Sequence, residues 1–190
     1  MTLFEYISIA TTIVLSFSLS RTLSNMAPAF LSPARYWVHS LWVLGLLIGH
    51  VNMFWQLWLY QSVESWTLLT FVLLLLGPIM FLVCASLILP QEPADNYQAY
   101  FESVRVPCYG VLIAIQVQPI PLTLLLFDIS LFHPIHILNL LFAVPFLVGL
   151  IMQKTWLDKV LVCIWFIGLL AGLAANNTHD AALEVLRSLQ

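Results

Sequence analysis

Three hydrogen-bonding side chains stand in the otherwise apolar stretch GLLIGHVNMFWQLW, residues 45–58: His50, Asn52 and Gln56. Imidazole and carboxamide groups donate and accept hydrogen bonds, so they can bind a small solute, and an imidazole can also carry a proton. In an apolar environment each of these groups needs a partner, because an unpaired polar group in hydrocarbon costs several kcal/mol. We therefore expect all three side chains to face other protein segments or water.

Matching polar groups occur in two further apolar segments of the chain. The stretch QVQPIP contains Gln116 and Gln118, and the stretch HPIHILN contains His136 and Asn139. We predict that the polar groups of the three segments converge on one pocket in the outer half of a helix bundle. The alternative is that they bond to one another and only hold an apolar bundle in register.

Two prolines, Pro119 and Pro121, follow directly in the second of these segments. Proline has no backbone N–H and clashes with the preceding turn, so both must disturb the helical hydrogen bonds. We expect the carbonyls freed there to accept hydrogen bonds from Asn52 or His50.

A longer polar series occupies the first apolar segment. Its members recur every three or four residues and therefore share one face of a helix: Glu5, Ser8, Thr12, Ser16, Ser20 and Ser24. Small hydroxyl groups of this kind pack against other helices and bond to backbone carbonyls. The functional alternative is a polar wall along a water-filled path, with Glu5 at its outer mouth.

Composition places these segments in a membrane. Hydrophobic residues make up 62% of the 190 residues and charged residues only 8%, whereas about 25% is usual in soluble domains. The mean hydropathy is +0.98. A soluble domain needs polar side chains to cover its surface, and here they are gathered between long apolar runs. We predict a single integral membrane domain over residues 1–190.

Apolar stretches long enough to cross roughly 30 Å of hydrocarbon occur six times in the sequence. Open strands would leave unpaired backbone groups in lipid, and the runs lack the alternation of a barrel, so each is predicted to be a helix. The predicted fold is all-α, a polytopic membrane protein with a six-transmembrane-helix bundle. The spans cover about 3–26, 36–60, 66–89, 103–126, 131–152 and 156–176.

Basic residues predict the orientation, because Lys and Arg near span ends stay on the cytoplasmic side. Five of the six basic residues lie near the first, third and fifth connections between spans: Arg21, Arg35, Arg105, Lys154 and Lys159. Only Arg187 lies on the opposite side. We therefore expect both termini on the outer side, and we predict an integral protein of the bacterial inner membrane. The pocket and Glu5 then lie toward the outer side.

Three smaller features accompany the spans. A short interfacial helix is predicted at about 95–105, with Asp95 as its N-cap and its end before Pro107. An amphipathic tail is predicted at 180–190. Two glycine pairs are predicted to let neighbouring helices approach closely, inside the monomer or in an oligomer: Gly45 with Gly49, and Gly168 with Gly172.

Motifs for catalysis are missing from the sequence. It has no phosphate-binding glycine loop, metalloprotease helix, nucleophile elbow or dinucleotide fingerprint. The three cysteines lack metal-ligand spacing, and His133 with His136 are too few ligands for a metal. We expect no catalytic residue, no metal and no cofactor, although His50 and His136 offer a haem alternative. With six basic residues and no basic patch, nucleic acid is not an expected partner.

Three functional hypotheses follow, in this order. The first is a channel or transporter that carries a small solute, ion or proton through the polar pocket, because polar faces coincide with prolines that permit bent helices. The second is a non-catalytic scaffold or accessory subunit of a membrane complex, with the bilayer and a homo-oligomer or another membrane protein as partners. The third is a haem-binding or other intramembrane redox protein.

Overall fold

The structure, a computed structural model, describes residues 2–175, and every regular element in that range is helical. Six of these helices or helix pairs are long and apolar enough to cross a membrane, which confirms the predicted six-helix membrane bundle. The elements are α1 (Leu3–Asn25), α2 (Ala27–Leu31), α3 (Trp37–Gln56), η1 (Leu57–Tyr60), α4 (Leu68–Ile88), α5 (Tyr97–Val117), α6 (Pro119–Phe127), α7 (Pro134–Met152) and α8 (Thr155–Ala175). The predicted tail at 180–190 lies outside the described residues.

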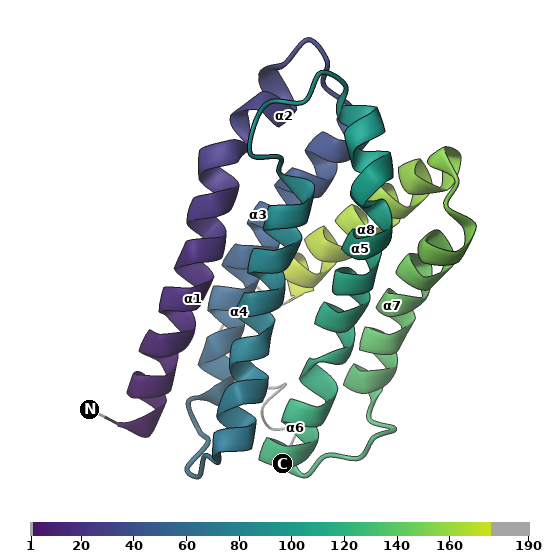
Figure 1. Ribbon diagram of the computed structural model, residues 1–190. Coiled ribbons are helices and arrows are strands. Elements are labelled where there is room, and N and C mark those ends of the chain that lie inside the picture. The colour runs from purple at the N-terminus through teal and green to yellow at the C-terminus, as the bar shows by residue number, and fades with distance from the viewer. Residues whose placement is uncertain (1, 176–190) are drawn as a thin grey trace.

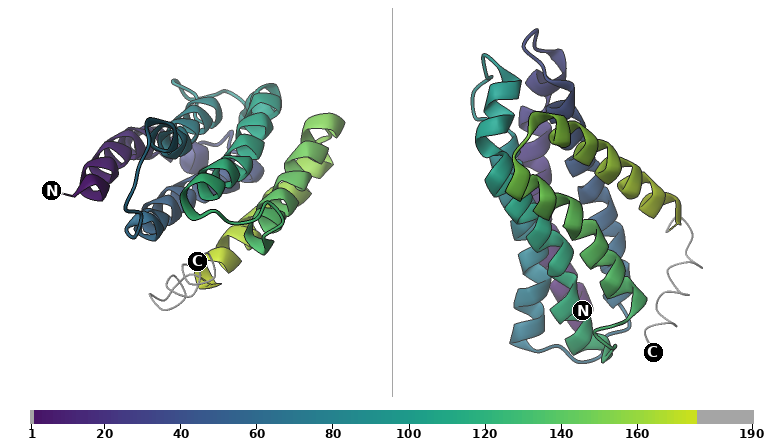
Figure 2. Two further views of the ribbon diagram at one scale, coloured as in Figure 1. Left: turned by 90° about the horizontal axis from the view of Figure 1, so that it is seen from below. Right: turned by 90° about the vertical axis from the view of Figure 1, so that its right-hand side faces the viewer.

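The helices alternate in direction and pack side by side (Figure 1). α1 packs mainly on α4, α4 on α5, and α5 on α7, while α8 crosses behind the others and packs on α3 (Figures 1 and 2). The connections 32–36, 89–96 and 153–154 lie at one end of the bundle, and the connections 61–67 and 128–133 lie at the other. We call these the basic end and the pocket end, since Arg35 and Lys154 lie at the first.

Local sequence explains where the helices begin. Thr2 caps α1 through a capping box with Glu5, and Thr67 caps α4 in the same way with Thr70. Asn96 caps α5 by accepting hydrogen bonds from the backbone N–H groups of Gln98 and Ala99. These side chains satisfy N–H groups that have no partner inside the helix.

Proline and left-handed residues explain where helices end. α5 ends at Val117 and α6 begins at Pro119, so the predicted disturbance at QVQPIP is a break between two helices. α6 ends at Phe127 and α7 ends at Met152, and each is followed by a left-handed capping residue of the kind that closes helix C-termini, Asp128 (φ 51°) and Gln153 (φ 48°). The break separates α5 from a short α6 that remains in the same spanning segment.

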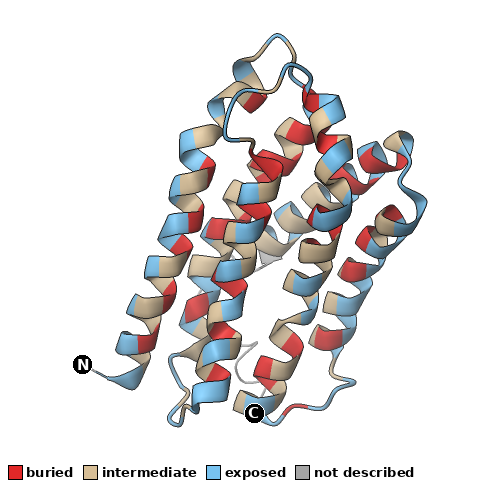
Figure 3. Cartoon of the chain, viewed as in Figure 1, coloured by how far each residue is buried: buried red, intermediate tan, exposed pale blue. Residues whose placement is uncertain are grey.

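An aromatic cluster fills the core between α3, α5, α7 and α8. Trp42 is 1% exposed, and its indole packs against the rings of Phe101, Tyr109, Phe146 and Trp165 at centroid distances of 4.7–6.4 Å. The buried residues lie on the inward faces of the helices, and the outward faces are exposed and apolar (Figure 3). Outward apolar faces are expected for helices that contact lipid.

Three of the four predicted packing glycines contact a neighbouring helix. A Cβ atom added at Gly45 would overlap the ring of Trp165 on α8, and one at Gly49 would lie 2.8 Å from Phe81 on α4. A Cβ at Gly168 would lie 2.5 Å from the ring of Phe142 on α7. Gly172 has no atom within 4 Å of that position. The contacting glycines each seat an aromatic ring rather than a second helix backbone.

The segment predicted as an interfacial helix at about 95–105 differs in the structure. It forms the first turns of α5, which begins at Tyr97 after the N-cap Asn96 and continues through Pro107. The side chains of Tyr97 and Phe101 are each 1% exposed and belong to the core. Their apolar face was predicted to lie on the membrane surface, but it packs against protein, so the helix extends into the bundle.

The polar face predicted for α1 is also not the face that packs. The residues of α1 buried against its neighbours are Ile7, Thr11, Leu15, Ser18 and Thr22. Glu5, Ser16, Ser20 and Ser24 are exposed, and Ser8 and Thr12 are half-buried at the edge of the contact. α1 carries hydroxyl groups on all sides, so the spacing of polar residues predicted a face next to the one that packs against the bundle.

Candidate functional site

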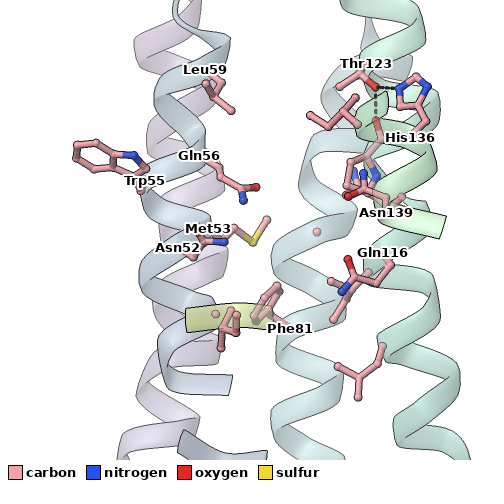
Figure 4. Close-up of a pocket in the computed structure, with 18 of the residues that line it drawn as sticks. Asn52, Met53, Trp55, Gln56, Leu59, Phe81, Gln116, Thr123, His136 and Asn139 are labelled. Carbon is pink, nitrogen blue, oxygen red and sulfur yellow. Dashed lines mark hydrogen bonds between the residues drawn. The ribbon is translucent and has the colours of Figure 1, made fainter. Parts of the chain in front are cut away.

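A pocket of about 290 Å³ lies inside the bundle between α3, the α5–α6 break and α7. Six of the seven residues predicted to converge on a pocket line it: Asn52, Gln56, Gln116, Gln118, His136 and Asn139. Figure 4 shows Gln56 and Met53 of α3 on one side, facing Gln116, Asn139 and His136 on the other, while Trp55 points away. Residues from three segments far apart in the sequence therefore face one cavity.

Four carboxamides at this pocket have no hydrogen-bond partner among the described residues: Asn52, Gln56, Gln116 and Asn139. The oxygen Oδ1 of Asn52 is also buried from solvent. Gln118 is different, because its Nε2 donates to the carbonyl of Leu73 on α4 and ties the helix break to that helix. An unpaired carboxamide at a cavity is free to bond to whatever enters it.

His136 is held in one orientation at the pocket wall. Its Nδ1 lies 3.2 Å from the carbonyl oxygen of Leu131, and its Nε2 lies 2.9 Å from the hydroxyl of Thr123, which also lies 2.8 Å from the carbonyl oxygen of Pro119. His136 is 1% exposed and Thr123 is 8% exposed. Thr123 of α6 was not predicted, because a single threonine in an apolar run has no distinctive spacing. This bond fixes α6 against α7 next to the helix break.

His50 does not line the pocket. Its Nδ1 donates to the carbonyl of Leu46 at 2.6 Å, and its Nε2 accepts from the hydroxyl of Ser18 on α1 at 2.6 Å. The ring of Phe81 lies edge-on to the imidazole at 5.0 Å, and Phe81 is itself part of the pocket wall. His50 therefore points to the α1 side of α3, because it lies on the shoulder of the face that carries Asn52 and Gln56.

Two further expectations about polar residues do not match the structure. Asn52 and His50 do not bond to carbonyls freed by Pro119 and Pro121, since His50 bonds to Ser18 and Leu46 and Asn52 has no partner. Glu5 and the predicted hydroxyls Ser8, Thr12 and Ser16 are not among the residues that line the pocket. The carboxylate of Glu5 accepts from the backbone N–H of Thr2 at the start of α1.

A buried ion pair near the basic end was not predicted. Arg105 Nη1 lies 3.0 Å from Asp158 Oδ2, and the hydroxyl of Tyr109 donates to Asp158 Oδ1 at 2.7 Å. Asp158 is 0% exposed and the side chain of Arg105 is 14% exposed. Both charges lie inside predicted spans, and an intramembrane charge requires a partner. That rule would have suggested the pair from the sequence.

The same cluster extends to its neighbours at the basic end. Glu102 accepts a hydrogen bond from Thr155 at 2.9 Å, which joins the start of α8 to α5. Tyr36 precedes α3, and burial, followed by the carboxylates of Asp158 and Glu102, raises the pKa of its phenol. The polar groups here join α5 to α8, while the hydroxyl of Tyr36 is buried without a hydrogen-bond partner in the described part of the chain.

A second hollow lies at the pocket end, over the connections 61–67 and 128–133. It is lined by Glu64, Ser65 and Asp128, among others, and it shares Phe127 with the main pocket. The ring of Phe127 stacks on Tyr60 with centroids 6.1 Å apart. Phe127 thus stands between a polar surface hollow and the intramembrane pocket.

Comparison with known proteins gives no relative from which a function could be transferred. No protein-family model, no curated protein and no solved structure matches this chain.

Proposed function

We propose that this chain is a membrane transporter or channel for a small solute, which binds in the pocket between α3, the α5–α6 break and α7. One observation carries the proposal: unpaired carboxamides from three separate helices line one cavity of about 290 Å³. Polar groups that serve only to join helices are paired with each other or with backbone. Groups kept unpaired at a cavity have a ligand or water as their natural partner.

The lining favours an uncharged solute over an ion. None of the residues that line the pocket is an aspartate, glutamate, lysine or arginine. An ion that enters a low-dielectric site without a counter-charge loses hydration that the site does not replace. Of the solute, ion and proton expected from the sequence, we therefore put the solute first.

The break between α5 and α6 supports transport rather than static binding. Pro119, at the start of α6, lines the pocket beside Gln118. In many transporters the substrate site lies where a membrane helix is interrupted, because the half-helix ends and the unwound backbone there contact the substrate. A movement of α6 relative to α5 would change the pocket at its polar wall.

Orientation completes the proposal. We place the basic end in the cytoplasm of a bacterial inner membrane, because five of the six basic residues lie near its connections. The pocket end, with the hollow beside Phe127, then faces outward. Both termini are outside in this arrangement. A cysteine placed at Ser62 should be labelled from outside intact cells, and one placed at Asn96 should not.

Solute flux tests the proposal directly. Purified protein in liposomes is mixed with urea, acetamide or glycerol, and swelling is followed by stopped-flow light scattering. We expect faster swelling than in empty liposomes, and a return to background with Asn139→Phe, whose ring fills the cavity. Leu141→Phe is the matched control, because Leu141 lies on the same helix and is 61% exposed. Equal rates with and without protein for all three solutes, or full flux through Asn139→Phe, would contradict it.

The scaffold interpretation is our second candidate. It is favoured by the polar groups that are paired inside the bundle, namely Ser18 with His50 and Gln118 with Leu73. These bonds join α1 to α3 and the helix break to α4, so their role is to hold helices together. An absence of flux would move this interpretation to first place. The haem alternative has less support, since His136 lines the pocket but His50 does not, and both ring nitrogens of His50 are hydrogen-bonded to Ser18 and Leu46.

A further inference from the structure

Building on the proposed function, we propose that the pocket selects uncharged, flat molecules that carry a hydrogen-bond donor and acceptor on adjacent atoms. Primary and cyclic amides and nucleobases are molecules of this class. The inference comes from the chemistry of the pocket walls and from its size.

The polar walls match an amide. A carboxamide presents an acceptor oxygen and a donor NH₂ side by side, and its natural complement is another group with the same pair reversed. Asn52 and Gln56 offer such pairs from α3, and Gln116 and Asn139 offer them from the opposite wall (Figure 4). Carboxamide side chains use this pairing when they read the edge of an adenine base.

The same walls discriminate against other small molecules. A charged molecule finds no opposite charge, because no acidic or basic side chain apart from the hydrogen-bonded His136 lines the pocket. A purely apolar molecule of the same shape leaves the carboxamides unpaired, including Asn52 Oδ1, which is already buried without a partner. A site built to form hydrogen bonds rejects an analogue that lacks them more strongly than an apolar site rejects an added group.

Aromatic rings and aliphatic side chains share the remaining walls, and two of the rings are held in place by their neighbours. Phe81 packs against Gly49, where a Cβ would lie 2.8 Å from its ring, so the glycine lets the ring stand close to α3. Phe127 is stacked on Tyr60, and both rings face the cavity. With a volume of about 290 Å³, the pocket lies at the lower end of the range for small-molecule sites. Its size therefore fits a molecule of one ring, or of two fused rings, in contact with the aromatic side chains of the lining.

Four probes of nearly equal shape test this class: benzamide, toluene, benzoate and benzamidine. Each is titrated against the full chain in lipid nanodiscs, and binding is measured by saturation-transfer NMR. The signal from Asn139→Phe nanodiscs is subtracted, because it reports partitioning into the lipid. We expect benzamide to bind at least about tenfold more tightly than each of the other three. Gln116→Leu should weaken benzamide and strengthen toluene.

The outcomes separate this inference from the proposed function. If toluene binds as tightly as benzamide, the pocket is a site for apolar molecules, and if a charged probe binds best, the site is ionic. Either result overturns the amide class while solute flux can still be observed. If no probe binds above the Asn139→Phe background, the class is wrong whatever the flux shows. Preference for benzamide without any flux would support the class and contradict transport.

Discussion

Two groups of polar side chains lie inside this apolar bundle, and they are built in opposite ways. Near the basic end, Asp158 bonds to both Arg105 and Tyr109 and is completely buried. Toward the pocket end, Asn52 and Gln116 face a cavity and have no partner among the described residues. In the first group both carboxylate oxygens of Asp158 are bonded, although Arg105 Nε is buried without a partner among residues 2–175, whereas the second group leaves its carboxamides available.

The paired group is expected to stabilise the fold, and the unpaired group is expected to bind a ligand. A buried charge pair holds helices together because the loss of either partner leaves the other unpaired in a low-dielectric interior. An unpaired carboxamide contributes nothing to helix association and costs free energy wherever water does not reach it. If this comparison is correct, substitutions at the ion pair destabilise the fold, and substitutions at the pocket leave the fold intact and remove binding.

The largest effect is expected at Asp158. Asp158→Leu should lower the free energy of unfolding by about 3–5 kcal/mol, because it leaves Arg105 buried without its partner. Unfolding is measured by SDS titration in mixed micelles. The double variant Asp158→Leu with Arg105→Leu should recover most of the loss, since apolar residues of similar volume often replace a buried pair without penalty. A double variant as unstable as the single one would show that the charge pair is not the reason.

A smaller loss is expected at Tyr109. Tyr109→Phe removes the hydroxyl that donates to Asp158 at 2.7 Å and keeps the ring within the aromatic core. Hydrogen bonds to charged groups are worth about 1.5–3 kcal/mol, so the variant should lose that amount in the same SDS titration. Tyr100→Phe serves as the control, because its hydroxyl donates to the uncharged carbonyl of Leu87. Equal losses in both variants would argue against a special role for the charge.

The sequence predicted the pocket better than it predicted the ion pair. A carboxamide in an apolar segment cannot face lipid without losing its hydrogen bonds, so Asn52, Gln116 and Asn139 were expected inside the bundle. They line one cavity. His50 was expected with them but lies one helix face away, because neighbouring positions on a helix point about 100° apart. Arg105 was used only to predict the orientation and Asp158 was not singled out, although the rule that an intramembrane charge requires a partner applies to both.

Some backbone features could also be predicted from the sequence, and others could not. The break at Pro119 follows from local chemistry and was predicted. The buried face of α1 does not follow, because α1 carries serines and threonines on several faces, and packing against α4 and α3 determines that Thr11, Ser18 and Thr22 are buried. Local hydrogen bonding is encoded in a few neighbouring residues, whereas the choice between two similar helix faces is made by the partner helix.

The Ser18–His50 bond provides an intermediate case, since it is buried and paired but uncharged. A double-mutant cycle with Ser18→Ala, His50→Ala and both together should give a coupling of about 0.6 kcal/mol, and no more than about 1.7 kcal/mol, as for other hydrogen bonds between membrane helices. Unfolding in mixed micelles measures each corner of the cycle. Coupling near zero would mean that α1 is held to α3 by packing alone.

The smallest effect on stability, and the most informative one, is expected at Asn52. Asn52→Leu removes a carboxamide whose oxygen is buried without a partner, so the free energy of unfolding should stay the same or rise by up to about 1 kcal/mol. Binding of benzamide should fall at the same time, because one donor and acceptor pair is lost from the pocket wall. Such a result would mean that Asn52 does not stabilise the fold and that its role is to bind a ligand. If Asn52→Leu instead destabilises the protein as Tyr109→Phe does, the carboxamide has a structural partner and the contrast between the two ends of the bundle is lost.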